Sequence, residues 1–77
     1  REVEDALNAI AASAKRRAAL DVAAEEARAA TRLARELFLA GRSDFLTLLN
    51  AQTTQFAAED TAIDARRTEF SAAIALY

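Results

Sequence analysis

The sequence contains no cysteine and no histidine. Without cysteine there is no disulfide framework and no thiolate, and without histidine as well the usual ligand sets for zinc, copper and haem are missing. The polar side chains that remain, chiefly carboxylates, hydroxyls and arginines, form no recognised nucleophile or acid–base signature. We therefore predict that this chain is not an enzyme and that it holds no metal and no cofactor.

Turn-forming residues are also scarce, because the chain has no proline and a single glycine, Gly41. The sequence on either side is rich in alanine, leucine, glutamate and arginine, which favour helix. Gly41 suits the left-handed residue that ends a helix, and Ser43 or Asp44 can cap the first amides of the next one. The pattern predicts one all-α hairpin. Its predicted elements are a helix over about residues 2–40, a tip at 41–43 and a helix over about residues 44–77.

Charge and hydropathy give no sign of a nucleic-acid or membrane partner. The 12 acidic and 10 basic residues leave a net charge of −2, which is too balanced to attract a polyanion. The longest apolar run covers residues 72–77, whereas a membrane-spanning helix needs about 20 residues. No signal peptide is visible. Because the chain begins at Arg1 without a methionine, we expect it to be a segment of a longer protein.

The second predicted helix repeats large apolar residues every seven positions. These residues are Leu49, Phe56, Ile63, Phe70 and Tyr77, and the alternate three-and-four spacing is filled by Leu46, Thr53, Asp60, Arg67 and Ile74. Such a heptad pattern is typical of a coiled-coil seam. The first helix carries a weaker matching seam, at Val3, Ala6, Ile10, Ser13, Arg17, Leu20, Ala24, Ala27, Thr31, Ala34 and Phe38. We therefore predict an antiparallel two-helix coiled coil about 50 Å long.

Folding the chain back at Gly41 pairs residues whose numbers sum to about 84. This alignment sets small residues opposite large ones, for example Ala27 opposite Phe56, which favours close packing. It also brings Arg17 near Arg67, and two guanidinium groups cannot share a dry seam. We expect both arginines to reach water or a neighbouring carboxylate, from Asp21, Asp60 or Asp64.

Several leucines lie off the predicted seam. They are Leu7, Leu33, Leu37, Leu48 and Leu76. A single stripe between two helices buries too little apolar surface to offset the conformational entropy lost when a chain of this length is ordered. We therefore predict that the hairpin packs against further helices, as in a bundle or a wall of helices. Small alanines on more than one face of each helix permit such packing.

Two charged clusters have simpler interpretations than a ligand site. Asp60 and Asp64 lie one turn apart and next to Glu59, so a cation could bridge them. Helix-bundle metal sites, however, usually add Glu-x-x-His motifs, and histidine is absent. Residues 15–17 are basic, but no aromatic residue is interleaved to support a nucleic-acid contact. We interpret both clusters as solvated faces.

Residues 40–52 read Ala-Gly-Arg-Ser-Asp-Phe-Leu-Thr-Leu-Leu-Asn-Ala-Gln, so the glycine is followed by Phe-Leu-x-x-Leu-x-Ala-Gln. This run, together with the alanine-rich helix after it and the closing Ala-Leu-Tyr, resembles the last periplasmic hairpin of TolC-like outer membrane efflux factors. The resemblance is close at the tip and looser over the rest of the chain. It implies that the chain is one hairpin of a homotrimeric export channel, a fragment of the helical barrel that crosses the periplasm.

The same resemblance implies partners and a location. The tip, formed by Ala40, Gly41, Arg42 and Ser43, corresponds to the part of the family that docks onto a periplasmic adaptor protein, which links the tunnel to an inner-membrane pump. A small residue at the turn lets a partner backbone approach, and Arg42 and Ser43 offer hydrogen-bond donors. The segment is expected in the periplasm and its parent protein in the outer membrane. Membrane contact is expected only through β-barrel segments that lie outside this chain.

The resemblance also implies a gate near the tip. In the family an aromatic residue before the tip and acidic residues after it close the periplasmic entrance, and the matching positions here are Phe38, Thr47 and Asn50. Phe38 lacks a hydroxyl, and Thr47 and Asn50 lack a charge. An acidic ring is therefore not expected from this hairpin, which leaves an amide and hydrophobic gate.

A second function satisfies the same periodicity. A self-contained coiled-coil hairpin, acting as an oligomerisation module or as the interaction module of an adaptor, needs the same two heptad arms. Flanking sequence distinguishes the two, since alternating strand patterns of about ten residues before Arg1 and a glycine-rich end after Tyr77 would favour the channel.

Overall fold

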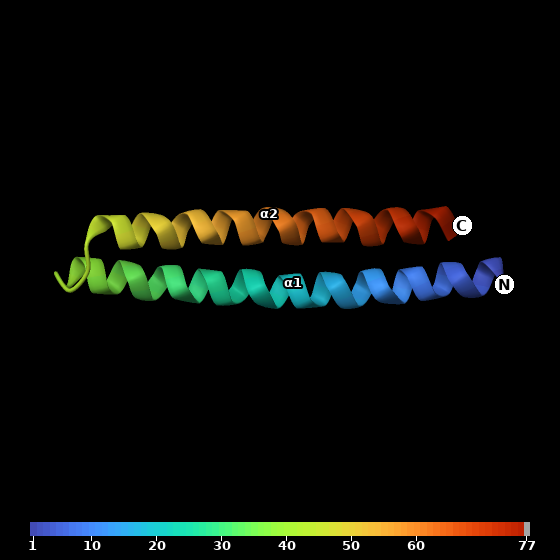
Figure 1. Ribbon diagram of the computed structural model, residues 1–77, viewed down its shortest axis with the longest axis horizontal. Helices are drawn as coiled ribbons and strands as arrows, with labels where there is room; N and C mark the ends of the chain where they lie inside the picture. Colours follow the sequence, from blue (N-terminus) through green and yellow to red (C-terminus); the bar gives the residue numbers. More distant parts are fainter. Residues whose placement is uncertain (77) are drawn as a thin grey trace.

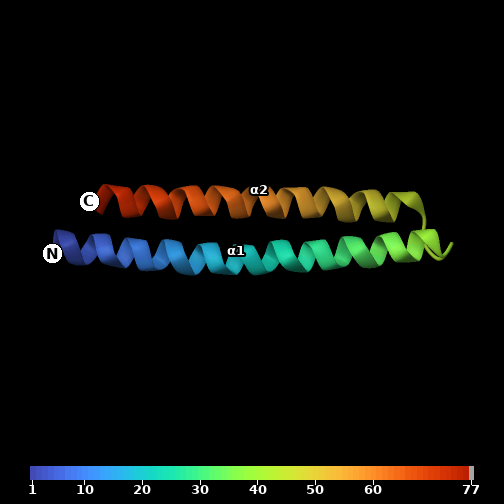
Figure 2. The same cartoon turned by 180° about the vertical axis from the view of Figure 1, so that it is seen from behind.

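The computed structural model describes residues 1–76, which form two long helices. Helix α1 spans Glu2–Leu39 and helix α2 spans Phe45–Leu76. The helices lie side by side and antiparallel, with both chain ends at the end of the rod opposite the turn (Figures 1 and 2). The rod measures 59 × 13 × 12 Å. The predicted all-α antiparallel hairpin is confirmed. At the tip, α1 ends at Leu39 and α2 begins at Phe45, each one residue further from the turn than predicted.

Composition explains why α1 is continuous. Its 38 residues include no glycine or proline and are rich in alanine, the strongest helix former. Glu2, Glu4 and Asp5 lie in its first turn, where carboxylates offset the positive end of the helix dipole. Neither described helix contains a stretch that is both long and apolar enough to span a bilayer.

The seam predicted on α1 is confirmed along most of its length. Ala24, Thr31 and Ala34 are buried, and half-buried residues continue the same line toward both ends. The hydroxyl of Thr31 donates to the carbonyl of Ala27 at 3.0 Å and to that of Ala51 on α2 at 3.1 Å. The two ends of the line differ from the prediction, since Val3 and Phe38 are exposed and Leu37 is half-buried.

The seam predicted on α2 is wrong. Leu48, Ala62 and Ala65 are the buried residues of this helix, whereas Phe56 and Phe70 are 61% and 67% exposed. Each of the predicted large residues, from Leu49 to Phe70, follows a true seam position by one residue. One residue is a rotation of about 100° around the helix axis, so the large apolar residues face outward. Tyr77, the last residue of the predicted seam, lies outside the described residues.

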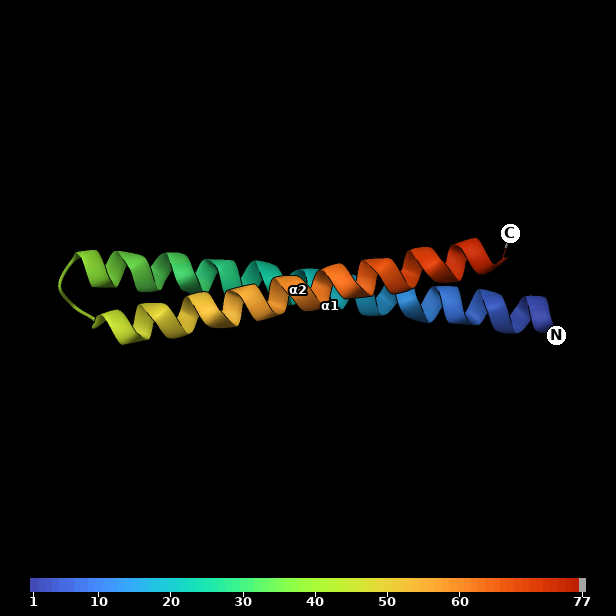
Figure 3. The ribbon, with the colours of Figure 1, turned by 90° about the horizontal axis from the view of Figure 1, so that it is seen from above.

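Close contact between alanines explains the rotation. Helices that meet through small side chains approach more closely than helices held apart by rings, and alanines are the buried residues at the centre of both helices. The rotated setting also brings Glu59 and Glu69 of α2 within 2.8 Å of arginines on α1. Figure 3 shows the resulting coiled coil from above, with the two helices crossing at a shallow angle.

The expectation for Arg17 and Arg67 is confirmed in part. Arg17 donates from Nη1 to Asp21 at 3.3 Å, as expected, and also from Nε to Glu69 at 2.8 Å, which was not expected. Arg67 is exposed to solvent, the other expected outcome, as are Asp60 and Asp64. The two arginines do not share a layer of the seam, because the rotation of α2 leaves Arg67 outside it.

Candidate functional site

The tip is closed by a helix end that depends on glycine. Gly41 has a φ of 74°, a left-handed conformation that glycine adopts without steric cost. The amide of Gly41 donates to the carbonyl of Phe38 at 3.0 Å, and the amide of Arg42 donates to that of Leu37 at 2.8 Å. These two bonds define a Schellman motif. Because they satisfy the last carbonyls of α1, the chain can turn back at once.

Asp44, one of the two residues predicted to cap the second helix, performs this role. Its Oδ1 accepts a hydrogen bond from the amide of Thr47 at 2.9 Å and another from the Thr47 hydroxyl at 2.8 Å. The bond from the backbone amide, with that from the hydroxyl, lowers the pKa of Asp44 below its ordinary value. Ser43 caps nothing, since its hydroxyl donates only to the carbonyl of Asp44 at 3.4 Å.

This cap predicts an acid-sensitive helix start. A carboxylate whose pKa is lowered by folding stabilises the hairpin above its ordinary pKa of 3.8, and the contribution is lost as the pH falls through the lower folded value. Asp44→Asn keeps an acceptor oxygen that does not titrate. Between pH 7 and pH 2 we expect the Tm of the native chain to fall by about 5 °C more than that of Asp44→Asn. Thermal unfolding followed by circular dichroism measures this, and a difference in Tm that does not change with pH would contradict it.

The predicted docking residues form one exposed surface. Ala40, Gly41 and Arg42 are exposed and Ser43 is half-buried. No atom lies within 4 Å of the place that a Cβ on Gly41 would occupy. The tip therefore offers accessible backbone beside the guanidinium of Arg42, an arrangement suited to a partner chain that approaches closely.

A single hairpin does not gather the three gate candidates into one cluster. The ring of Phe38 packs edge-on against Phe45, with centroids 5.7 Å apart and planes at 61°. Thr47 follows Phe45 by two residues, about 200° around the helix, and its hydroxyl is bound to Asp44. Asn50 lies one turn after Thr47, and both are exposed. These three residues would meet only if several hairpins came together.

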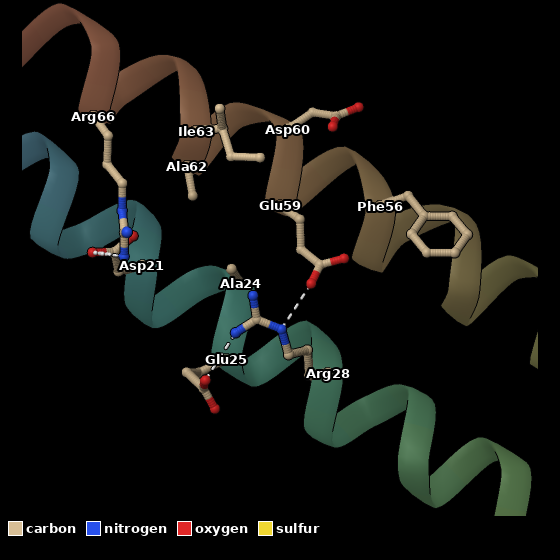
Figure 4. Close-up of a pocket in the computed structure, with 10 residues that line it drawn as sticks. All are labelled: Asp21, Ala24, Glu25, Arg28, Phe56, Glu59, Asp60, Ala62, Ile63 and Arg66. Carbon is tan, nitrogen blue, oxygen red and sulfur yellow. Dashed lines mark hydrogen bonds and ion pairs between the residues drawn. The ribbon is translucent and has the colours of Figure 1, made fainter.

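A groove of about 650 Å³ lies between the two helices near the middle of the rod (Figure 4). Ala24 and Ala62 lie between its walls. The other residues that line it are Asp21, Glu25 and Arg28 from α1 and Phe56, Glu59, Asp60, Ile63 and Arg66 from α2. Four of these side chains are acidic and two are basic, so the lining carries a net charge of −2.

Arginines hold the groove together across the two helices. Arg28 donates to Glu59 of α2 and to Glu25 of α1, both at 2.8 Å. Asp21 accepts from Arg66 of α2 and from Arg17, both at 3.3 Å. Partial burial raises the pKa of Asp21, but the bonds from the two arginines outweigh it, and the pKa lies below its ordinary value. Solvent-exposed ion pairs contribute little stability, so we assign these pairs mainly to the register of the helices.

One wall of the groove belongs to a long apolar stripe. Phe56 and Ile63 stand on α2 at this wall (Figure 4). Exposed apolar residues of the same heptad line extend it in both directions, and we call the set the apolar stripe: Leu49, Phe56, Ile63, Phe70 and Ile74. Polar residues at positions 53, 60 and 67 lie between these large side chains, but exposed apolar residues repeated at heptad spacing are typical of a helix-packing face.

Sequence reasoning missed the groove because it assigned the apolar stripe to the seam of the hairpin itself. A signal was present in the charges. Arg28 with Glu59, Arg17 with Glu69 and Asp21 with Arg66 are opposite charges whose numbers sum to 86 or 87. Charge pairing across the hairpin would have identified which side of α2 faces α1.

Comparisons with known proteins add no name to this site. No family model matches the sequence, and no significant similarity was found to a curated protein or to a solved structure. Within residues 1–76 no three metal-ligating side chains cluster together.

Proposed function

We propose that this chain is a structural hairpin that packs against further helices, and that its setting is the periplasmic barrel of a TolC-like export channel. The observation that carries the general part is the apolar stripe, in which Phe56 and Phe70 are more than half exposed although they recur at heptad spacing. A heptad line of large apolar residues serves helix packing, and here it is not used within the hairpin. Another helix is the natural partner for it.

The channel setting rests on residues 40–52, whose wording resembles that family. In this proposal three copies of the parent protein form the tunnel, the hairpin lies in the periplasm, and the tip docks onto a periplasmic adaptor that links the tunnel to an inner-membrane pump. The exposure of Ala40, Gly41 and Arg42 supports a docking role. Phe38, Thr47 and Asn50 of neighbouring hairpins would form an amide and hydrophobic gate.

An export assay with the full-length parent protein tests the docking role. Arg42→Glu reverses the charge at the tip without changing the left-handed residue Gly41, so we expect export to be lost while trimers still assemble in the outer membrane. Arg16→Glu is the matched control, because Arg16 is also exposed but lies on α1 far from the tip. Normal export by Arg42→Glu would remove Arg42 from the docking surface.

One observation favours the alternative, a self-contained coiled-coil module for oligomerisation or adaptor contact. The hairpin closes its own seam with ion pairs between α1 and α2, Arg17 with Glu69 and Arg28 with Glu59. Such pairs specify alignment without help from a parent protein. The two functions differ in the sequence that flanks the hairpin, because only the channel requires β-strands there.

A further inference from the structure

The apolar stripe carries two opposite charges that the hairpin leaves unused. Asp60 and Arg67 lie seven residues apart on α2. Each stands between two large residues of the apolar stripe in the three-and-four spacing, and both are exposed. Within the described chain neither of them forms an ion pair, although five other ion pairs are present. Whatever covers the stripe must therefore face one carboxylate and one guanidinium embedded among apolar side chains.

The spacing of these charges selects an orientation for a second copy. If two α2 helices lie parallel and in register, Asp60 meets Asp60 and Arg67 meets Arg67, which is unfavourable. If they lie antiparallel about a two-fold axis near Asp64, Asp60 of each copy comes within about 1.5 Å, measured along the axis, of the level of Arg67 of the other. Both charges are then paired, twice, in a closed isologous contact. One like-charge contact remains, between the two copies of Asp64 beside the axis, whereas the parallel pair sets Asp60, Asp64 and Arg67 each against its own copy.

We propose that two copies of this chain pair through their apolar stripes, with the α2 helices antiparallel and with reciprocal ion pairs between Asp60 and Arg67. The proposal rests on the general part of the proposed function, which is that another helix covers the stripe. For the chain by itself in solution, that helix is α2 of a second copy. It concerns the chain outside the channel, because three copies arranged around one tunnel point the same way and cannot pair antiparallel.

The groove completes the fit. An antiparallel partner places its residues 62–72 along the groove wall that residues 56–66 of α2 form. These residues carry two acidic and two basic side chains and so have no net charge. The fit at the groove therefore comes from the ring of Phe70, which reaches its apolar edge, and from the cation of Arg67 beside Asp60. A reciprocal ion pair of this kind fixes register more than it adds affinity.

Charge exchange tests the pairing in solution. Sedimentation of the 77-residue chain should show a dimer, and Asp60→Arg or Arg67→Asp alone should raise the dissociation constant at least about tenfold, because each replaces two attractions by repulsions. The double variant Asp60→Arg with Arg67→Asp should restore the native value. Arg16→Asp, on α1 and away from the stripe, is the control and should leave it unchanged. A monomer at all concentrations, or a double variant no tighter than the single ones, would overturn the pairing.

Cysteine cross-linking tests the orientation, since the native chain has no cysteine. Asp64→Cys places the two thiols beside the two-fold axis and should give a disulfide-linked dimer on mild oxidation. Ala57→Cys places them about 21 Å apart along the axis in the antiparallel pair and should not cross-link. Cross-linking by both variants would indicate a parallel pair and overturn the proposal. None of these results changes the export prediction for Arg42, so the two proposals can fail separately.

Discussion

Replacing Ala65 by leucine is expected to lower the free energy of unfolding of the hairpin by about 1–3 kcal/mol. Ala65 is only 1% exposed and lies at the contact between the helices. Three added carbon atoms have no space there, so the helices must move apart and weaken the alanine contacts and the ion pairs beside them. On a chain of this length each kcal/mol lowers Tm by about 4–8 °C.

Ala57→Leu is the matched control for this prediction. Ala57 lies on the same helix but is exposed, so the same change should alter the free energy of unfolding by less than about 0.5 kcal/mol. Thermal unfolding of both variants at one protein concentration measures the difference. If Ala65→Leu were as stable as the native chain, α2 would not face α1 through its alanines, and the seam predicted from the heptads would be favoured again.

Replacing Gly41 by valine is expected to destabilise the hairpin by about 1–2 kcal/mol. The cost comes from the backbone alone, because Gly41 has a φ of 74° and nothing lies within 4 Å of an added Cβ. A β-branched residue resists this conformation and would disturb the two Schellman bonds that end α1.

Gly41→Asn separates backbone strain from any effect of side-chain size. Asparagine tolerates the left-handed region, so Gly41→Asn should retain most of the stability that Gly41→Val loses. Chemical unfolding followed by circular dichroism compares the two variants with the native chain. Equal losses for valine and asparagine would mean that the tip requires the absence of a side chain, and not the conformation of Gly41.

These results would also separate the two faces of α2. Substitutions at Ala62 and Ala65 act on the stability of one hairpin, whereas substitutions at Asp60 and Arg67 are expected to act on the association of two. The separation follows from exposure, since the alanines are buried within the chain and the two charges are not. The hairpin thus uses one side of α2 for its own seam, and in our proposal the apolar stripe serves a partner.

Local features of the fold could be predicted because they depend on neighbours in sequence. A chain without proline and with one glycine has a single place to turn, and Gly41 and Asp44 carry the backbone freedom and the acceptor oxygen that this turn uses. The seam of α1 was also predictable over most of its length, because a heptad line of mostly small residues, with Ile10 and Leu20, marks one side of that helix.

The positions of the groove and the apolar stripe could not be predicted from neighbouring residues in the sequence. Two heptad lines of opposite character run along α2. One holds the large residues Leu49, Phe56, Ile63 and Phe70, and the other, offset by two residues or about 200°, holds only alanines, at positions 51, 58, 65 and 72. Periodicity identifies both and ranks the larger residues first, because they bury more apolar surface. In the folded hairpin the small line faces α1.

The amino-acid sequence therefore determined by itself that the chain forms two helices, where it turns, and how α1 ends and α2 begins at the tip. These properties follow from interactions within a few residues. Only the tertiary structure decided how α2 is rotated about its own axis. That rotation depends on how closely two backbones approach and on which charges meet across the hairpin, such as Arg17 with Glu69. Residues far apart in the sequence settle both questions, and they leave the large apolar side chains on the outside.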